Sequence, residues 1–379
     1  MTRQLSITLP SKSYTYPIVI GEGLLQTDQL IKHLLSLKVS QYAIITDTTV
    51  ETLHAKILAM HLNNHKLKTI LISFPPGEDH KSRATKEFCE DKLLGIGAGR
   101  DTCIIGMGGG IVTDLAGFVA STYCRGVPSV MIPTSLLAMV DASIGGKTGL
   151  NVPQGKNLIG TITQPTAVFI DTATLTTLPL AEIKNGMAEI IKHGLIADKT
   201  YLDFLKANAK KLLNLDLQLM EEAIYGSVVI KGKIVEEDEA EKGKRRLLNF
   251  GHTVAHAVEI ATEHDIPHGR AVAIGVITES YLAMKMGHLQ LSDFNAICDI
   301  IDLYQIDLTW QGTLKPGHLL DIMRMDKKSL RQTPRFVILN EIGKPLEFDG
   351  QYCTVAEEKS LHQAIEWMCS HLMIKNGVC

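Results

Sequence analysis

The first half of the chain alternates short apolar runs with stretches of helical periodicity, a pattern that restricts the fold more than any other feature. The runs are rich in β-branched residues and lie at 42–46, 68–73, 102–105, 129–132 and 167–170. Such runs predict strands of a parallel sheet that are joined by crossover helices. Residues 6–9 and 16–20 predict a hairpin ahead of them. In this class of fold, ligands bind where the carboxyl ends of the strands meet.

After Leu178-Pro179 the pattern changes, and apolar residues recur at helical spacing. The expected helices lie at 182–196, 217–235, 252–262, 271–286 and 293–304. The charged run 236–246 is expected to be a loop between two of these helices. The sequence therefore predicts a Rossmann-like α/β domain with a parallel sheet over 1–178 and an all-α domain over 179–379.

Length and composition exclude several classes of protein. The 379 residues suffice for two domains with separate cores, and 45% hydrophobic with 21% charged residues is ordinary for a soluble globular protein. A net charge of -3 provides no bulk attraction to nucleic acid or to an anionic membrane. No segment resembles a signal peptide or a membrane span, and the seven scattered cysteines are expected to be reduced thiols in the cytoplasm.

One glutamate and two histidines from separate segments, Glu189, His252 and His268, are candidate ligands of a catalytic divalent metal ion. Three ligands of mixed nitrogen and oxygen type leave a position open for substrate or water, as catalytic zinc requires. The sequence has no CxxC pair for a structural zinc. Spacing alone leaves alternatives, because most histidines bind no metal and the i, i+4 partners His193 and His256 are equally well placed.

A glycine-rich segment, Gly106–Gly110, follows a predicted strand and precedes a predicted helix. Backbone amides there can approach a phosphate at the helix N-terminus, where the helix dipole favours negative charge. The segment departs from the regular dinucleotide fingerprint, because Ile111 occupies the third glycine position. A tight turn without a ligand is the alternative.

Two lysines are expected to lie in further glycine-rich loops, Lys147 in 141–149 and Lys156 in 155–157. Gly145-Gly146-Lys147-Thr148 is similar to part of a P-loop, but Asp141 stands where the upstream glycine of that loop would be. ATP hydrolysis is therefore disfavoured. For the lysines themselves, anion binding and simple solvation both stay open.

Three strings taken together resemble the 3-dehydroquinate synthases, a family of sugar-phosphate cyclases. They are PTSLLAMVDASIGGKTGLN at 133–151, NGMAEIIKHG at 185–194 and LNFGHTVAHAVE at 248–259. The resemblance runs through nearly the whole chain from Asp47 to Lys328. It implies a Rossmann-like NAD-binding domain, a helical metal- and substrate-binding domain, and an active site in the cleft between them.

The resemblance also implies roles for individual residues. It assigns the metal ion, zinc or cobalt, to Glu189, His252 and His268. It assigns NAD contacts to Asp47, Gly77, Glu78, Lys81, Gly110, Asp114, Thr134, Ser135, Lys147, Lys156, Thr174 and Thr177. It assigns substrate contacts to Asp141, Lys147, Asn157, Lys192, Lys231, Arg245, Asn249, His256 and one of Lys327 and Lys328. Arg125 matches an arginine that reaches the active site of a neighbouring subunit, which implies a homodimer.

The implied reaction converts 3-deoxy-D-arabino-heptulosonate 7-phosphate into 3-dehydroquinate and phosphate, a step of the shikimate pathway. NAD would oxidise the substrate transiently, phosphate would leave by β-elimination, the hydride would return, and an intramolecular aldol reaction would close the ring. Lys147, Asn157, one of Lys327 and Lys328, and Arg125 of a neighbouring subunit would bind the phosphate. Lys231 and Arg245 would bind the carboxylate.

Three alternatives share part of this pattern. A metal-dependent polyol or glycerol dehydrogenase would need fewer lysines and arginines and would release reduced cofactor. A cyclase acting on sedoheptulose 7-phosphate or glucose 6-phosphate would bind no carboxylate, so Lys231 and Arg245 weigh against it. A non-catalytic nucleotide-binding regulator would have lost metal ligands, and all three candidates are present.

Overall fold

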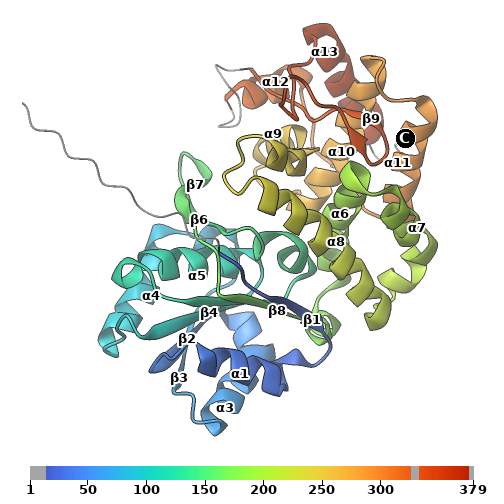
Figure 1. The fold of residues 1–379 in the computed structure, drawn as a ribbon. Helices are drawn as coiled ribbons and strands as arrows, with labels where there is room; N and C mark the ends of the chain where they lie inside the picture. The colour runs from blue at the N-terminus through green and yellow to red at the C-terminus, as the bar shows by residue number, and fades with distance from the viewer. Residues whose placement is uncertain (1–13, 326–332, 375–379) are drawn as a thin grey trace, which may run out of the picture.

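The computed structural model describes residues 14–325 and 333–374, and in it a parallel sheet and a group of helices lie side by side (Figure 1). The sheet has six strands in the order β1-β8-β5-β4-β2-β3, all paired in parallel. Five of them confirm the predicted strands: β2 Gln41–Asp47, β3 Thr69–Phe74, β4 Thr102–Gly108, β5 Ser129–Pro133 and β8 Ala167–Asp171. The sixth, β1 Ile18–Gly21, pairs with β8, and its predicted hairpin partner at 6–9 lies outside the described residues.

Helices cover both faces of the sheet, which explains why β2, β4, β5 and β8 are buried along their whole length. They are α1 Asp28–Ser36, α2 Thr48–Val50, α3 Lys56–Asn64, α4 Arg83–Gly95 and α5 Gly110–Thr122. On β2, Ile44 packs into the core that α1 and α3 cover, and Ile45 packs into the core that α4 and α5 cover. Successive side chains of a strand point to opposite faces, so a run without polar residues needs a helical layer on each side.

The second half of the described chain is mainly helical, as predicted. It contains α6 Leu180–Ala197, α7 Lys199–Leu213, α8 Leu217–Glu237, α9 His252–Ala261, α10 His268–Lys285, α11 Leu291–Leu303, α12 Pro316–Met325 and α13 Glu358–Trp367. The prediction omitted α7, α12, α13 and the small ladder of β9 Leu339–Glu341 with β10 Lys344–Pro345. None of the described helices is both long and apolar enough to cross a membrane.

The segment 147–162 is an antiparallel hairpin, β6 Lys147–Val152 with β7 Gly155–Ile162, and the prediction of glycine-rich loops there is wrong. The glycines of this hairpin allow its two strands to pair closely. A Cβ at Gly160 would lie 1.9 Å from the carbonyl oxygen of Thr148, so glycine at 160 lets the two backbones approach. The hairpin stands beside α5 and extends toward α9 in Figure 1.

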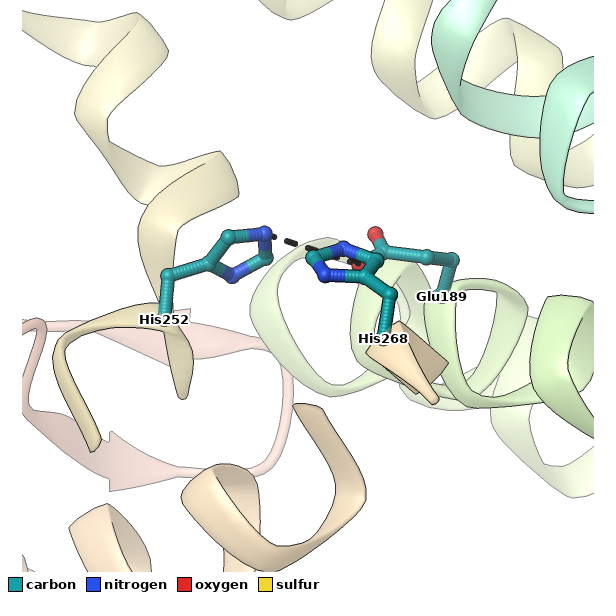
Figure 2. A group of neighbouring side chains, drawn as sticks. All are labelled: Glu189, His252 and His268. Carbon is teal, nitrogen blue, oxygen red and sulfur yellow. Dashed lines mark ion pairs between the residues drawn. The ribbon is translucent and has the colours of Figure 1, made fainter. Parts of the chain in front are cut away.

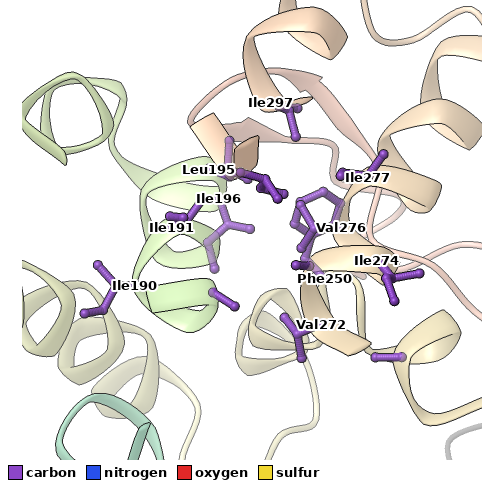
Figure 3. Close-up of a cluster of buried hydrophobic side chains, with 14 of the residues drawn as sticks. Ile190, Ile191, Leu195, Ile196, Phe250, Val272, Ile274, Val276, Ile277 and Ile297 are labelled. Carbon is purple, nitrogen blue, oxygen red and sulfur yellow. The ribbon is translucent and has the colours of Figure 1, made fainter. Parts of the chain in front are cut away.

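The largest hydrophobic core continues from the sheet into the helical half. Val168 and Ile170 of β8 belong to the same cluster as Ile183 and Met187 of α6. Deeper in the helical half, Phe250 is fully buried between α6 and α10 (Figure 3). Because this packing is shared, α6 is held at a fixed place relative to the sheet, which matters for the side chains it carries.

Two glycines let α10 pack directly against the start of α9. Gly251 has φ +80, a backbone conformation that favours glycine, and it precedes His252. A Cβ at Gly275 of α10 would lie 1.9 Å from the carbonyl oxygen of Gly251. This contact of backbone on backbone fixes the beginning of α9 against α10.

Replacing Gly275 by alanine is expected to lower the free energy of unfolding by roughly 1–3 kcal/mol, because the added methyl group has no space. Gly232 of α8 is the matched control: apart from its chain neighbours and the backbone of its own helix, no atom lies within 4 Å of the position its Cβ would take. Gly232→Ala should be neutral or stabilise by up to about 1 kcal/mol. Urea denaturation measures both variants, and equal stability of the two would contradict the close contact.

Candidate active site

The structure brings Glu189, His252 and His268 together from three helices (Figure 2). Glu189 lies in the middle of α6, and the two histidines are the first residues of α9 and α10. Nε2 of His252 and Nε2 of His268 each lie 3.6 Å from Oε1 of Glu189. The three ligand atoms all lie within 4.8 Å of one another, and this is the one such group that the described residues form.

The donor atoms of this group suit a divalent cation. Glu189 is fully buried, and its Oε1 has no hydrogen-bond partner among the described residues although two histidine nitrogens face it. A buried carboxylate oxygen without a partner is costly, and a bound cation would remove that cost. One oxygen and two imidazole nitrogens are a common ligand set for zinc, and cobalt accepts the same donors.

Neighbouring charges keep the acidic ligand ionised. Burial alone would raise the pKa of Glu189, but the charge of Lys192 and the facing ring of His268 lower it to about 2. Burial would lower the pKa of His268, but the carboxylates of Glu189 and Glu259, which face its two ring nitrogens, raise it to about 10. A proton on Nε2 of His268 would therefore have to leave before a cation could bind to that nitrogen.

The two alternative histidines lie elsewhere. His193 is fully buried, and its Nδ1 lies 2.7 Å from Oγ of Ser227 on α8. Burial and the charge of Lys192 lower the pKa of His193 to about 3, so its ring is neutral. His256 follows His252 by one turn, with ring centres 5.7 Å apart, and it lines the adjoining cavity. Neither belongs to the group of three candidate ligands.

A cavity of about 730 Å³ adjoins this group and is lined by residues from both halves of the chain. Its lining includes every described residue that was predicted to contact the substrate of its own subunit: Asp141, Lys147, Asn157, Lys192, Lys231, Arg245, Asn249 and His256. Lys327 and Lys328 lie outside the described residues. Arg125 does not line the cavity; it is exposed after α5, in a short turn where Cys124 and Arg125 both have positive φ.

The cations of the cavity are held by polar partners. Lys192 contacts Glu189 and donates to the carbonyl oxygen of Leu248 at 2.8 Å. Lys231 forms an ion pair with Asp141. Burial alone would raise the pKa of Asp141, but the charges of Lys231 and Lys192 hold it below its usual range. These pairs keep the side chains charged in a buried place.

Arg245 joins the two halves of the chain and keeps one donor unused. It is 1% exposed and donates to the carbonyl oxygens of Glu239 at 2.6 Å and Gly145 at 2.9 Å. Its Nε is buried and has no hydrogen-bond partner among the described residues. A buried guanidinium with an unused N–H can donate a hydrogen bond to one further anionic oxygen.

Most of the predicted NAD contacts lie at one edge of the sheet, either just after the carboxyl end of a strand or in the first turns of the helix that follows. Lys147 and Lys156 are the exceptions. Asp47 caps α2 by accepting from the backbone N–H groups of Thr49 at 2.9 Å and Val50 at 3.0 Å. Lys81 donates to Asp114 at 2.5 Å and to Asn157 at 2.6 Å, so this edge contacts the hairpin. The others at this edge are Gly77 and Glu78 after β3, Gly110 in α5, Thr134 and Ser135 after β5, and Thr174 and Thr177 after β8. Lys147 begins β6 and Lys156 lies on β7.

Sequence reasoning missed two acidic residues of the site. Glu241 lines the cavity, pairs with Lys147 and accepts from Asn249 at 2.6 Å, although the charged run around it was expected to be a solvated loop. Glu259 lies 3.5 Å from Nδ1 of His268. Glu259 follows His252 by seven residues and His256 by three, so all three lie on one face of α9. This spacing could have identified Glu259 from the sequence.

Comparison with known proteins identifies the family. The profile of the 3-dehydroquinate synthase N-terminal domain matches residues 71–185, and that of the C-terminal domain matches residues 186–329. The chain belongs to the 3-dehydroquinate synthase family. The 3-dehydroquinate synthase of Pseudoalteromonas translucida is 41% identical over 90% of this chain and 94% of its own length. Members of the 3-dehydroquinate synthase family are carbon-oxygen lyases of the shikimate pathway.

Two solved structures share the fold of this 3-dehydroquinate synthase family member. One is a 2-deoxy-scyllo-inosose synthase complexed with carbaglucose-6-phosphate, NAD+ and Co2+, with 25% identity, a TM-score of 0.85, and 92% of this chain and 95% of that chain covered. The other is a 2-epi-5-epi-valiolone synthase from Streptomyces hygroscopicus with NAD+ and Zn2+, with 27% identity, a TM-score of 0.86, and 96% and 99% covered. Both bind NAD+ and a divalent metal ion, the cofactors expected from the sequence.

His268→Ala is expected to lower bound metal and activity together, because it removes one of three ligands. The loss of metal affinity should exceed the roughly 10- to 100-fold that removal of an outer-shell partner causes. His256→Ala is the matched control and should keep the metal while losing rate. Metal content after dialysis, measured by mass spectrometry, tests both, and full metal retention by His268→Ala would refute the ligand assignment.

Proposed function

We propose that this protein converts 3-deoxy-D-arabino-heptulosonate 7-phosphate into 3-dehydroquinate and phosphate. The observation that carries the proposal is the placement of three candidate metal ligands beside a cavity rich in lysine and arginine, next to the edge of the sheet expected to bind NAD. A doubly anionic phosphate and a carboxylate on one substrate account for that concentration of positive charge. The proposal agrees with the family to which the chain belongs.

Glu189, His252 and His268 would hold the metal ion, and the residues at the carboxyl edge of the sheet, with Lys147 and Lys156 of the hairpin, would hold NAD. When bound, NAD supplies a hydride acceptor and the metal ion supplies Lewis acidity toward the hydroxyl group that is oxidised. Lys192, Asn249 and His256 would orient the hydroxyl groups of the substrate, and Asp141 would keep Lys231 in place. Such positioning contributes several kcal/mol to barrier lowering in enzymes.

The phosphate end of the substrate would bind at the hairpin. Lys147 and Asn157 line the cavity from β6 and β7, and one of Lys327 and Lys328 is proposed as a third contact. Lys147 pairs with Glu241, so a phosphate would have to compete with this carboxylate. A phosphate offers Lys147 a stronger partner, because it carries more charge than the carboxylate. The leaving phosphate would then remain bound to the same cations.

The carboxylate end of the substrate would bind Arg245 and Lys231. Support comes from the buried, unpartnered Nε of Arg245 and from the position of both side chains in the lining of the same cavity. The substrate of a related cyclase that acts on a sugar phosphate without a carboxylate would offer these donors no anion. A buried donor without its partner is costly, so the pair would select for an acidic sugar.

Three further assignments belong to the proposal. The domains are proposed to divide at residues 1–178 and 179–379. The functional unit is proposed to be a homodimer in which Arg125 reaches the neighbouring active site, because Arg125 is exposed and does not line the cavity of its own chain. The reaction is proposed to take place in the cytoplasm, which the free state of the six described cysteines supports.

The parent protein is expected to prefer the heptulosonate phosphate over sedoheptulose 7-phosphate by roughly 10²- to 10³-fold in kcat/KM, because the second sugar leaves Arg245 without its anion. Arg245→Ala should lose most of this preference. Arg246→Ala is a matched control, since Arg246 lines the same cavity and donates to Gln351. Comparable turnover of both sugars by the parent would refute the proposed substrate.

Mixing Arg125→Ala protein with Lys147→Ala protein is expected to restore part of the activity that each lacks alone. A heterodimer would contain one active site with both native residues if Arg125 acts across the interface. Phosphate release measures the recovery, and exchange of differently labelled subunits is the control. Complete exchange without any return of activity would contradict the role of Arg125 across the dimer.

A further inference from the structure

Glu259 is a buried carboxylate on α9 with two basic neighbours from different parts of the fold. It is 5% exposed. Its Oε1 lies 3.5 Å from Nδ1 of His268 and 3.5 Å from Nζ of Lys156. Lys156 belongs to β7 of the hairpin, whereas His268 begins α10 in the helical half. A single carboxylate oxygen therefore faces both a candidate metal ligand and the hairpin.

We propose that Glu259 is a positioning residue that orients His268 for the metal ion and links the metal centre to the β6–β7 hairpin through Lys156. This inference rests on the metal site of the proposed function and not on the identity of the substrate. It assigns Glu259 no contact with the metal ion or with the reacting atoms.

The orientation of His268 follows from its two ring nitrogens. Nε2 faces Oε1 of Glu189, and Nδ1 faces Oε1 of Glu259. A carboxylate only accepts hydrogen bonds, so Glu259 favours the tautomer in which Nδ1 carries the proton. Nε2 then presents its lone pair toward Glu189, where the cation would bind. Metal-ligating histidines generally have such an outer partner, which also increases their basicity.

The link to the hairpin follows from two adjacent residues. Lys156 contacts Glu259 in the helical half, and Asn157 accepts a hydrogen bond of 2.6 Å from Lys81 at the edge proposed to bind NAD. A cofactor that binds Lys81 and Lys156 would change the contact of Lys156 with Glu259. The carboxylate would then no longer be shared with Lys156 and would act more strongly on His268. NAD should therefore strengthen metal binding, and by linkage the metal ion should strengthen NAD binding equally.

The test is a titration of metal-free protein with Co2+, followed by its visible absorption spectrum. Glu259→Gln is expected to weaken Co2+ binding by roughly 10- to 100-fold and to change the spectrum, and Glu259→Asp should recover part of the affinity. Glu263→Gln is the matched control, because Glu263 is exposed just after α9 and should leave the affinity unchanged. Unchanged affinity and spectrum in a folded Glu259→Gln protein would overturn the positioning role.

The link is tested by repeating the titration with saturating NAD. The expected result is several-fold tighter Co2+ binding in the parent and a smaller effect in Glu259→Gln. An NAD effect of equal size in both proteins, or none in the parent, would overturn the link. The titration uses no sugar phosphate, so a parent that binds Co2+ as expected but releases no phosphate would count against the proposed function and not against this inference.

Discussion

The buried carboxylate of Glu189 is the constraint around which the candidate site is built. An ionised carboxyl group in a fully buried place is tolerated only beside positive charge or hydrogen-bond donors. Lys192 contacts one oxygen, and two histidines face the other. To bring those histidines to Glu189, α9 and α10 must begin at the same place, which the close contact between Gly251 and Gly275 permits. The glycines of this region thus serve the placement of ligands.

The second requirement is that two different halves of the chain meet at one cavity. The sheet offers its carboxyl edge and the β6–β7 hairpin, and the helical half offers the candidate metal ligands and most of the cations. Their cores are continuous through β8 and α6, so the two halves do not rely on surface contacts alone. Ion pairs such as Lys231 with Asp141 keep the cavity charged and its side chains ordered.

The sequence allowed the main elements to be predicted, because buried strands and amphipathic helices have distinct periods. It did not allow the hairpin to be recognised, since Gly149 and Gly160 interrupt the strand pattern for a reason, close backbone approach, that depends on the partner strand. Spacing left five candidates for three ligand positions, and the family resemblance was needed to choose among them. The fold agrees with that choice, because the ring of His193 lies against Ser227 and outside the ligand group. Glu259 was overlooked because its role depends on two contacts outside its own helix, with Lys156, which is distant in sequence, and with His268 of the next helix.

The central claim is that the NAD cofactor and the metal ion together support a cyclisation in which the substrate undergoes no net oxidation. The most direct measurement incubates the metal-loaded protein with 3-deoxy-D-arabino-heptulosonate 7-phosphate and substoichiometric NAD, and follows phosphate and NADH together. The account predicts one phosphate per substrate consumed, phosphate in large excess over NAD, and no accumulation of NADH. Accumulation of NADH in proportion to the sugar consumed, without phosphate release, would contradict the account and indicate a dehydrogenase.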